Sequence, residues 1–445
     1  MKRSAWRYLW SARDIRRKLL ITLLILAIYR WAAHVPVPGA NLEVIEQILE
    51  GGGAGGTLVG LLDLLSGGTV SNFSVMAMGV YPYITSQIIL QLLVPIIPAW
   101  QRRMEEDPRE GRKWMEKWTL MMAVPMAALQ AVGQINIFSS FAGGLPVVDN
   151  FGLSGPNLLP SLTVVISMTA GTMFAIWLGE LISEFGIRNQ GLSLIIFAGI
   201  VSRVPVTLGA ILAGNDVVIG IVLMTIITLL TIFAVVFVQQ GRRNVPVMYP
   251  GRRMGQRMSM PVKGTLPLMV NMAGMIPIIF AQSLLTFPAI IASFFISSST
   301  EWVSNLALNV QQIFGGQSDI YWILYFLSVV AFTFFYTNVL FAQQNYGENL
   351  KRAGARVPGV SPGPPTQRYL NKVLSRITFP GAFFLGLVAI LPWLLTKIFP
   401  FENAGSLLLV SSAGLLIVVG VVRDTFFNIE AELKLHGYDD QLLVR

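Results

Sequence analysis

The sequence predicts an all-α integral membrane protein with ten transmembrane helices, and three observations support this fold class. Hydrophobic residues make up 54% of the 445-residue chain and charged residues only 12%, against about 25% charged residues in soluble domains. The apolar residues gather in runs of about 20, the length that a helix needs to cross a bilayer core of about 30 Å. The basic residues gather in every second connection between these runs, as expected for a protein that crosses the membrane repeatedly.

Ten apolar segments are long enough to cross a bilayer as helices, in which the backbone polar groups are hydrogen-bonded within the segment. They are 19–36, 73–98, 118–138, 158–182, 192–212, 217–238, 266–294, 320–341, 377–398 and 406–422. The first segment follows a basic stretch but runs into Arg30 and the string HVPVPG, without a small-residue cleavage pattern. We therefore expect a retained first helix and not a cleaved signal peptide.

The distribution of Lys and Arg predicts the orientation of the helices. All but three of the 32 basic residues lie in stretches 2–18, 102–117, 188, 242–263, 351–376 and 423–445. The exceptions are Arg30, Arg203 and Lys397. Basic connections stay on the cytoplasmic side, and an even number of spans returns the chain to its starting side. We therefore expect both termini in the cytoplasm.

A short apolar segment, TLVGLLDLLSGGTVSN at 57–72, follows the glycine-rich string GGGAGG at 51–56. It is too short to cross a bilayer, and its leucines fit about two turns of helix that end at Gly67 and Gly68. The residues alone favour a helix lying on the bilayer surface. The alternative is a hinged stopper that folds back into a cavity, for which the preceding glycines supply flexibility.

Residue types that catalyse reactions are scarce. The chain has no cysteine and two histidines, His34 and His436, neither near the centre of a span. Thiol chemistry is therefore excluded, and an intramembrane protease built on a serine and histidine pair is disfavoured. No GxxxxGK[ST] loop occurs, so ATP hydrolysis by this chain is not expected. We expect no enzymatic activity, no cofactor and no metal site.

The centres of the spans are nearly uncharged, which argues against an ion-coupled transporter. A transporter that uses hydroxyl and amide groups for a polar solute remains the alternative. The polar residues within the spans include Ser86, Gln87, Gln130 and Asn271, and interhelical hydrogen bonding is common for such groups.

Proline and glycine interrupt two of the spans, in GVYPYI at 79–84 and NMAGMIPIIF at 271–280. Both residues break regular helical hydrogen bonding. Irregular backbone at membrane depth is tolerated where it is packed in protein or lines a cavity. Each string alone is read first as a packing kink, but two such segments in opposite halves of the chain also fit a shared pathway.

An ordered set of longer strings resembles the SecY family of protein-conducting channel subunits. The strings are HVPVPG, LLSGGTVSNFSVMAMGVYPYITSQIILQLL, GTMFAIWLGELISEFGIRNQGLSLIIFAGIV, VNMAGMIPIIFAQSLLTFPA, FFYTNVLF, ENLKRAGARVPGV and SSAGLLIVVGVVRDT. Together they extend over nearly the whole chain, so no single short pattern carries the resemblance.

The resemblance implies two pseudo-symmetric halves of five helices around an hourglass pore. The first half would be 1–212, with the plug segment 57–72, and the second 213–445, with cytoplasmic docking loops 241–263 and 346–376. Such a channel passes unfolded polypeptide outward across the bacterial plasma membrane and releases transmembrane helices sideways into membrane lipid. Its implied partners are SecE, SecG, the motor ATPase SecA, the ribosome, signal peptides and nascent or unfolded polypeptide.

The resemblance also implies roles for residues at matching positions. The pore ring would comprise Val80, Ile84, Ile196, Ile276, Ile279 and Ile417. The plug would carry Leu58, Leu61, Leu62, Leu64 and Leu65. The lateral gate would contain Ser86, Gln87, Gln130 and Asn271. Ribosome or SecA docking would use Arg252, Arg253, Arg257, Lys351, Arg352 and Arg356.

One position departs from the family pattern. The family usually reads VPGIRPG where this chain has VPGVSPG, so that Ser361 replaces an arginine that the family uses in coupling to the motor. The details of SecA coupling are therefore open, while the expected channel architecture is unaffected.

Overall fold

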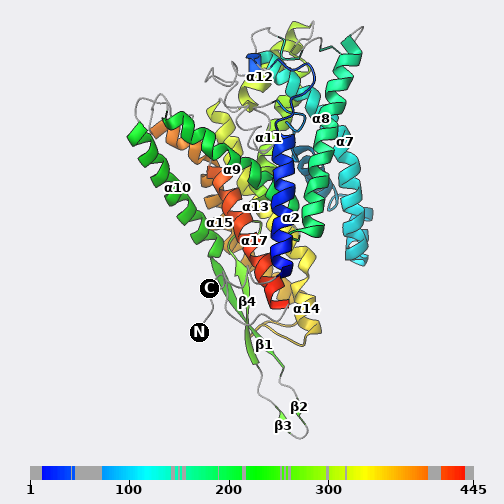
Figure 1. Cartoon of the computed structure of the whole chain (residues 1–445). Helices are drawn as coiled ribbons and strands as arrows, with labels where there is room; N and C mark the ends of the chain where they lie inside the picture. Colours follow the sequence, from blue (N-terminus) through cyan, green and yellow to red (C-terminus); the bar gives the residue numbers. More distant parts are fainter. Residues whose placement is uncertain are drawn as a thin grey trace.

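The structure, a computed structural model, is a bundle of long helices from which a β-hairpin projects (Figure 1). It describes residues 13–41, 43–45, 73–141, 146–148, 151–152, 157–188, 190–212, 217–250, 253–254, 257–258, 262–296, 300–315, 318–398 and 412–435. By length and apolar composition, five helices in these ranges qualify as membrane spans, and a sixth is obtained if one bent pair is counted together. The architecture agrees with the predicted helical membrane fold.

The helices follow one another along the chain with few long interruptions. In order they are α2 (Arg13–Ala32), α5 (Tyr81–Leu93), α6 (Pro98–Glu106), α7 (Pro108–Phe141), α8 (Leu158–Phe185), α9 (Gly191–Leu212), α10 (Val217–Gln240), α11 (Ile276–Ser293), α12 (Glu301–Phe314), α13 (Asp319–Gln344), α14 (Tyr346–Arg352), α15 (Pro364–Ile398) and α17 (Ser412–Leu435). Each predicted span overlaps one of them. Helices α7, α15 and α17 continue well beyond their apolar segments. Hydropathy marks only the apolar part of a helix, and the helix itself can continue through polar residues.

The predicted span 73–98 is wrong at both ends. Residues 73–80 form turns, and α5 begins only after Gly79, whose φ is 50°, with Pro82 in the first helical turn. Pro95 follows the end of α5, and the chain then turns by 101° into α6. Hydropathy depends on composition alone, whereas a residue with positive φ and a proline ring determine where a helix begins and ends.

The predicted span 266–294 begins too early. Its first four residues belong to a strand that ends at Met269, and a turn with Gly274 at a φ of 66° separates this strand from α11. Pro277 then lies in the first turn of the helix. An apolar run can be strand or helix, and its composition does not distinguish the two.

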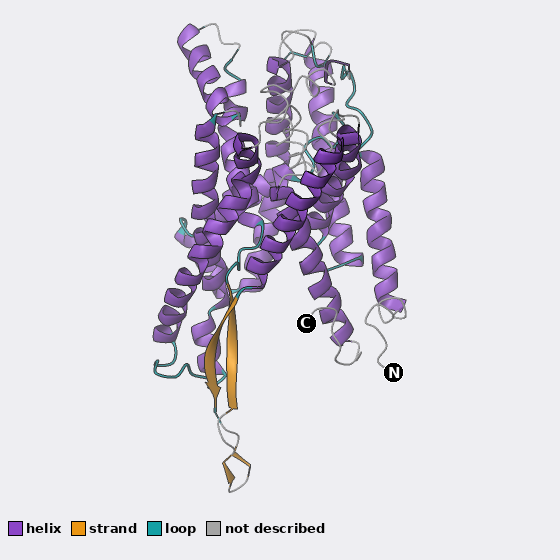
Figure 2. Cartoon of the chain, turned by 90° about the vertical axis from the view of Figure 1, so that its left-hand side faces the viewer, coloured by secondary structure: helices purple, strands orange, loops and turns teal. Residues whose placement is uncertain are grey.

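The basic loop at 241–263 contains strands that the sequence analysis did not predict. They are β1 (Arg242–Tyr249), β2 (Arg253–Met254), β3 (Arg257–Met258) and β4 (Val262–Met269). Strand β1 pairs antiparallel with β4, from Arg242 opposite Met269 to Tyr249 opposite Val262. Figure 2 shows that this hairpin extends beyond the helices at one end of the molecule. Helix α12 was also missed, and it packs against α11 and α13.

The helices pack in two groups. Helices α2, α5, α7, α8 and α9 contact one another, as do α10, α11, α13, α15 and α17. The largest contacts between the groups lie where α11 packs against α5 and α7, and where α9 packs against α10 and α17. We call the first contact the α11 seam and the second the α9 seam.

The beginning of α2 and the end of α17 lie together. Ile15 and Lys18 of α2 line a small pocket with Ile187, Asn428 and Ile429. The Asn428 side chain also donates a hydrogen bond to the carbonyl of Arg188, at 3.3 Å. Figure 1 places this end of the bundle on the same side as the hairpin and α14. Among the described residues, the start of α2, the end of α17, the basic hairpin and α14 thus share one end of the molecule, as their charge predicts.

Candidate functional site

The residues predicted to form the pore ring belong to, or pack against, one large buried apolar cluster. They come from four parts of the chain. Two lie at the start of α5, one in α9, two in α11 and one in α17. Val80, Ile84, Ile196, Ile279 and Ile417 are buried members of one apolar cluster, and Ile276 packs against it. We call these six residues the collar. All six are aliphatic, so the collar side chains carry no charge and no hydrogen-bonding group.

The local sequence places collar residues at two helix starts. Val80 precedes the first residue of α5, directly after Gly79, and Ile276 is the first residue of α11, two residues after Gly274. Both glycines have positive φ, a backbone conformation that costs glycine little. The Pro and Gly strings noted in the sequence are therefore helix starts that aim aliphatic side chains into the cluster.

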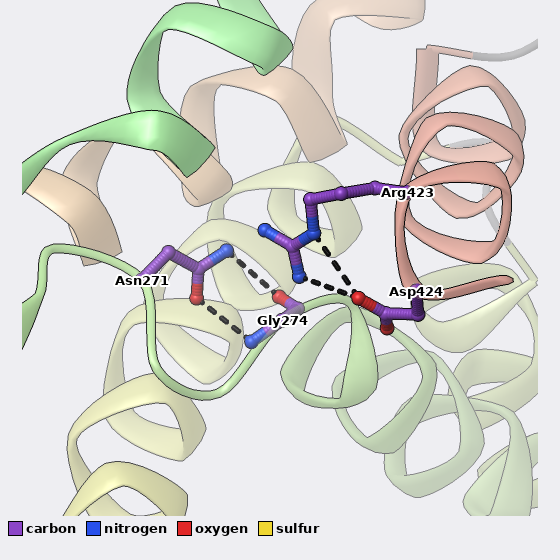
Figure 3. A network of polar contacts seen from close by, with 4 residues as sticks. All are labelled: Asn271, Gly274, Arg423 and Asp424. Atoms are coloured by element: carbon purple, nitrogen blue, oxygen red, sulfur yellow. Dashed lines mark hydrogen bonds and ion pairs between the residues drawn. The ribbon is translucent and has the colours of Figure 1, made fainter. Parts of the chain in front are cut away.

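Asn271 fixes the turn before α11. Its Oδ1 accepts a hydrogen bond from the Gly274 N–H at 2.9 Å, and its Nδ2 donates one to the Gly274 carbonyl at 3.0 Å. Figure 3 shows the Arg423 side chain of α17 pointing toward this turn while it bonds Asp424, with 2.9 Å between Nη2 and Oδ1. Asn271, predicted as a gate residue, thus acts within its own turn in this conformation.

The α11 seam is closed by contacts at two levels. Near the collar, the Tyr81 hydroxyl of α5 donates a hydrogen bond to the Ser283 carbonyl of α11 at 3.2 Å. Two helical turns further along α11, Ile290 packs against Gly133 of α7 so closely that a Cβ on Gly133 would lie 2.3 Å from Ile290 Cγ2. The hydroxyl of Ser293 lies 3.5 Å from the Gly133 carbonyl. Only glycine fits at this point of α7.

Ile290 also belongs to the core of the other helix group. It is a buried member of an apolar cluster whose other buried members all lie between Val37 and Met168. The packing of Ile290 into this cluster explains why α7 needs a glycine opposite it. We call Gly133 and Ile290 the notch.

The other predicted gate residues lie beside the α11 seam and do not bridge it in the contacts described. The Ser86 hydroxyl donates to the Pro82 carbonyl of its own helix at 2.8 Å. Gln130 Nε2 of α7 donates to Thr85 Oγ1 of α5 at 3.2 Å, which joins two helices of the same group. Gln87 is half-buried. Sequence reasoning missed the bridging residues, although Tyr81 adjoins a collar residue and Gly133 is a glycine within a span.

Several buried polar atoms near the seam are left without hydrogen bonds. Gln130 Oε1, Gln134 Nε2 and Ser283 Oγ are buried and have no partner among the described residues. Gln134 follows Gln130 by four residues in α7, so both side chains lie on one face of that helix. Each unsatisfied buried group costs about 1–3 kcal/mol. The closed seam therefore carries a free-energy cost that pairing with another group would relieve.

The predicted docking residues lie at the end of the molecule that carries the hairpin. Arg356 exchanges two backbone hydrogen bonds with Met248 of β1, at 2.8 and 2.9 Å, and these hold the two basic segments side by side. Lys351 and Arg352 flank Glu348 at 3.8 and 3.6 Å, and both side chains are exposed. Arg253 and Arg257 lie in the short strands β2 and β3.

Two groups of predicted residues fall outside the described part of the chain. They are the docking residue Arg252 and the plug residues Leu58, Leu61, Leu62, Leu64 and Leu65. Within the described residues, no group of three or more His, Asp or Glu side chains comes together that could hold a metal ion.

These features define a multi-pass membrane protein in which two groups of helices share a buried apolar cluster. A family model described as SecY matches residues 74–426. The chain is 36% identical over 442 residues to the protein translocase subunit SecY of Streptomyces galbus, with 96% of each chain covered. The chain belongs to the SecY family.

Solved structures agree on the fold. The chain is similar, with a TM-score of 0.64 and 19% identity over 96% of this chain and 95% of the other, to a SecY structure concerned with the plug domain and the closed state of the translocation channel. It is also similar to Sec61 in a canine ribosome-channel complex from the endoplasmic reticulum, with a TM-score of 0.59 and 17% identity over 96% and 95% of the chains. The fold is that of SecY and Sec61 channels.

Proposed function

We propose that this chain is the channel subunit that passes unfolded secretory polypeptides across a bacterial plasma membrane and releases transmembrane helices sideways into lipid. The observation that carries the proposal is the collar, whose six aliphatic side chains from separate parts of the chain share one apolar cluster beside a seam between two helix groups. The relationship to protein translocase subunits supports the channel. It gives no support to the alternative of a secondary solute transporter.

The chemistry of the collar suits an unspecific polypeptide channel. Aliphatic side chains form no directional bonds, so a passing chain of any sequence meets only a deformable apolar surface. When the channel is empty, a narrow apolar constriction excludes water and ions by dewetting. The collar thus acts as a seal and as a passage without binding its substrate.

The packing of the helices supports a division into halves at 1–212 and 213–445. Each half contributes one of the two helix groups, and the α11 seam and α9 seam are the contacts between them. We infer ten spans with both termini in the cytoplasm, since the start of α2, the end of α17 and the basic hairpin share one end of the molecule. Opening of the α11 seam would release a helix into lipid, while the α9 seam would act as the hinge.

The plug stays a prediction of the sequence. Segment 57–72 precedes the turns that lead into α5, so it is tethered close to the collar residue Val80. A two-turn apolar helix at the end of a short tether can reach the collar, and the SecY structure that concerns the plug domain gives this assignment its support.

The hairpin end is the proposed docking surface for SecA and the ribosome. Arg242 and Arg243 of β1 are exposed, and the bonds between Met248 and Arg356 hold the hairpin beside the segment 346–376. A projecting basic surface suits both RNA phosphates and an acidic protein surface. Ser361 is exposed within the same surface. SecE and SecG are the proposed membrane partners.

A reconstitution experiment tests the function. Liposomes that contain the chain, SecE and SecA are given ATP and a preprotein with a signal peptide, and import is measured as protection of the preprotein from added protease. We expect protected preprotein that requires both ATP and the signal peptide. Uptake of a small solute driven by an ion gradient, without protected preprotein, would favour the transporter.

A further inference from the structure

Tyr81 occupies a position that joins the collar to the α11 seam. It is the first residue of α5 and lies between the collar residues Val80 and Ile84. Its side chain is buried, with 4% of its surface exposed. The hydroxyl reaches across to the carbonyl of Ser283 at 3.2 Å, one helical turn after the collar residue Ile279. One hydrogen bond therefore connects the start of α5 to the middle of α11, and the segments on either side of it supply four of the six collar residues.

The same tyrosine is tied to α7 through its own carbonyl. Thr85 Oγ1 donates to the Tyr81 carbonyl at 3.0 Å, and Gln130 Nε2 of α7 donates to Thr85 Oγ1 at 3.2 Å. A chain of three hydrogen bonds thus runs from α7 through α5 to α11. Its first two bonds lie within one helix group, and the bond between Tyr81 and Ser283 is the one that crosses the seam.

We propose that Tyr81 is a positioning residue that latches the closed channel, so that the α11 seam and the collar open together. The inference rests on the proposed channel function and adds to it a specific residue. The acceptor is a main-chain carbonyl of α11, so movement of α11 away from α5 breaks the bond. The same movement separates Ile279 from Val80 and Ile84. This one hydrogen bond therefore opposes both the opening of the α11 seam and the separation of the collar residues, and it breaks when either occurs.

The strength of the bond suits a latch that must open. Side-chain hydrogen bonds between membrane helices are weak, and loss of one changes an equilibrium by about threefold. Such a bond favours the closed seam without preventing its opening by a hydrophobic segment that brings new contacts. Loss of the hydroxyl alone is expected to raise the population of the open seam about threefold.

The notch provides a probe that does not depend on transport. The chain has no cysteine, and Ile290 is buried in the seam, so Ile290→Cys places a single thiol where a maleimide can reach it only after opening. The rate of labelling of this thiol in the complete channel complex measures the open population. The change Tyr81→Phe is added to this parent, because it removes one oxygen and keeps the ring.

Tyr83→Phe is the matched control, since Tyr83 lies on the same helix and is half-buried. We expect Tyr81→Phe to raise the labelling rate about threefold and Tyr83→Phe to leave it at the parent value. Tyr81→Leu, which removes the hydroxyl together with the ring, should also raise the labelling rate. Equal rates for parent and Tyr81→Phe, or an equal rise in Tyr83→Phe, would overturn the latch.

The result separates the latch from the channel function. If Tyr81→Phe raises labelling while reconstituted channels import no preprotein, the latch holds and the proposed function fails. If channels import preprotein and labelling is unchanged by Tyr81→Phe, the function holds and the latch fails. Where both hold, Tyr81→Phe should increase import of a preprotein with a shortened signal about threefold relative to one with a full signal.

Discussion

The two seams between the helix groups differ in chemistry. At the α9 seam the buried residues that α9 and α17 add to the shared cluster are aliphatic, with Ile196 and Ile200 on α9 and Ile417 and Val421 on α17, while Gln239 of α10 is a buried amide without a partner among the described residues. At the α11 seam, aliphatic packing is joined by the Tyr81 bond, the notch and the Ser293 hydroxyl, and buried atoms of Gln130, Gln134 and Ser283 lack partners among the described residues. Separation of close-packed aliphatic groups costs free energy, whereas separation lets unpaired polar groups form hydrogen bonds with new partners. The larger number of polar contacts at the α11 seam supports the proposal that this seam opens and that the α9 seam acts as the hinge.

The largest expected effect comes from a methyl group in the notch. Gly133→Ala would place Cβ 2.3 Å from Ile290 Cγ2, and overpacking of this kind costs about 1–3 kcal/mol. We expect the α11 seam to open roughly 5- to 150-fold more often, measured as import of a preprotein with a weakened signal.

The matched control for the notch lies in α17. A Cβ on Gly420 would meet only ordinary contacts, at 3.7 Å from Met275 Sδ and 3.9 Å from Gln239 Nε2. Gly420→Ala should therefore leave import unchanged. Gly133→Ala combined with Ile290→Ala should return toward the parent value, because the colliding methyl group is gone. A Gly133→Ala channel that behaves as the parent would contradict the closed notch.

The collar provides the second prediction, in which two adjacent isoleucines of α11 are compared. Ile279 belongs to the collar cluster, while Ile278 is buried in the core of the second helix group. Ile279→Ser should raise ion conductance of the resting channel, because a hydroxyl lets water wet the constriction. Ile278→Ser should lower the stability of the folded channel without a specific leak. Equal leak from both variants would remove Ile279 from the collar.

A smaller effect than that of the notch comes from an unpaired amide. Gln134→Leu removes a buried Nε2 without a partner among the described residues, so the closed α11 seam should become more stable by about 1 kcal/mol. Import of a preprotein with a weakened signal should then fall by roughly fivefold, with little change for a strong signal. Import that rises in this variant would show that Gln134 is paired when the seam is closed.

The sequence predicted the helical membrane fold because hydropathy and charge act over whole segments. It misplaced the starts of α5 and α11, because the apolar residues before them form turns around Gly79 and Gly274. The hairpin was missed because its strands pair across the basic loop, and only the alternation of Val245 and Val247 within β1 indicates it. The composition of a segment does not indicate which distant strand it pairs with.

The site was predicted unevenly for a similar reason. The collar positions follow from matching strings; the structure places five of them in one large buried cluster with Ile276 packed against it, and their role as a pore ring stays a prediction. The bridging contacts of the seam depend on pairs far apart in the chain, such as Tyr81 and Ser283, which are separated by 202 positions. A polar residue within a span indicates a hydrogen bond, but not which helix supplies the partner. Hence Ser86 and Gln130 were placed in the gate, while Tyr81 and the notch were found only in the structure.

A reversible crosslink across the notch tests most directly that the α11 seam is the one that opens. The ideal Cβ at position 133 lies 3.4 Å from Ile290 Cβ, close to the spacing of about 3.5–4.5 Å in disulfides, and the chain has no cysteine to compete. In channels that carry Gly133→Cys and Ile290→Cys, we predict that oxidation blocks release of a transmembrane segment into lipid and that reduction restores it. Release at the same rate from oxidised and reduced channels would contradict the assignment.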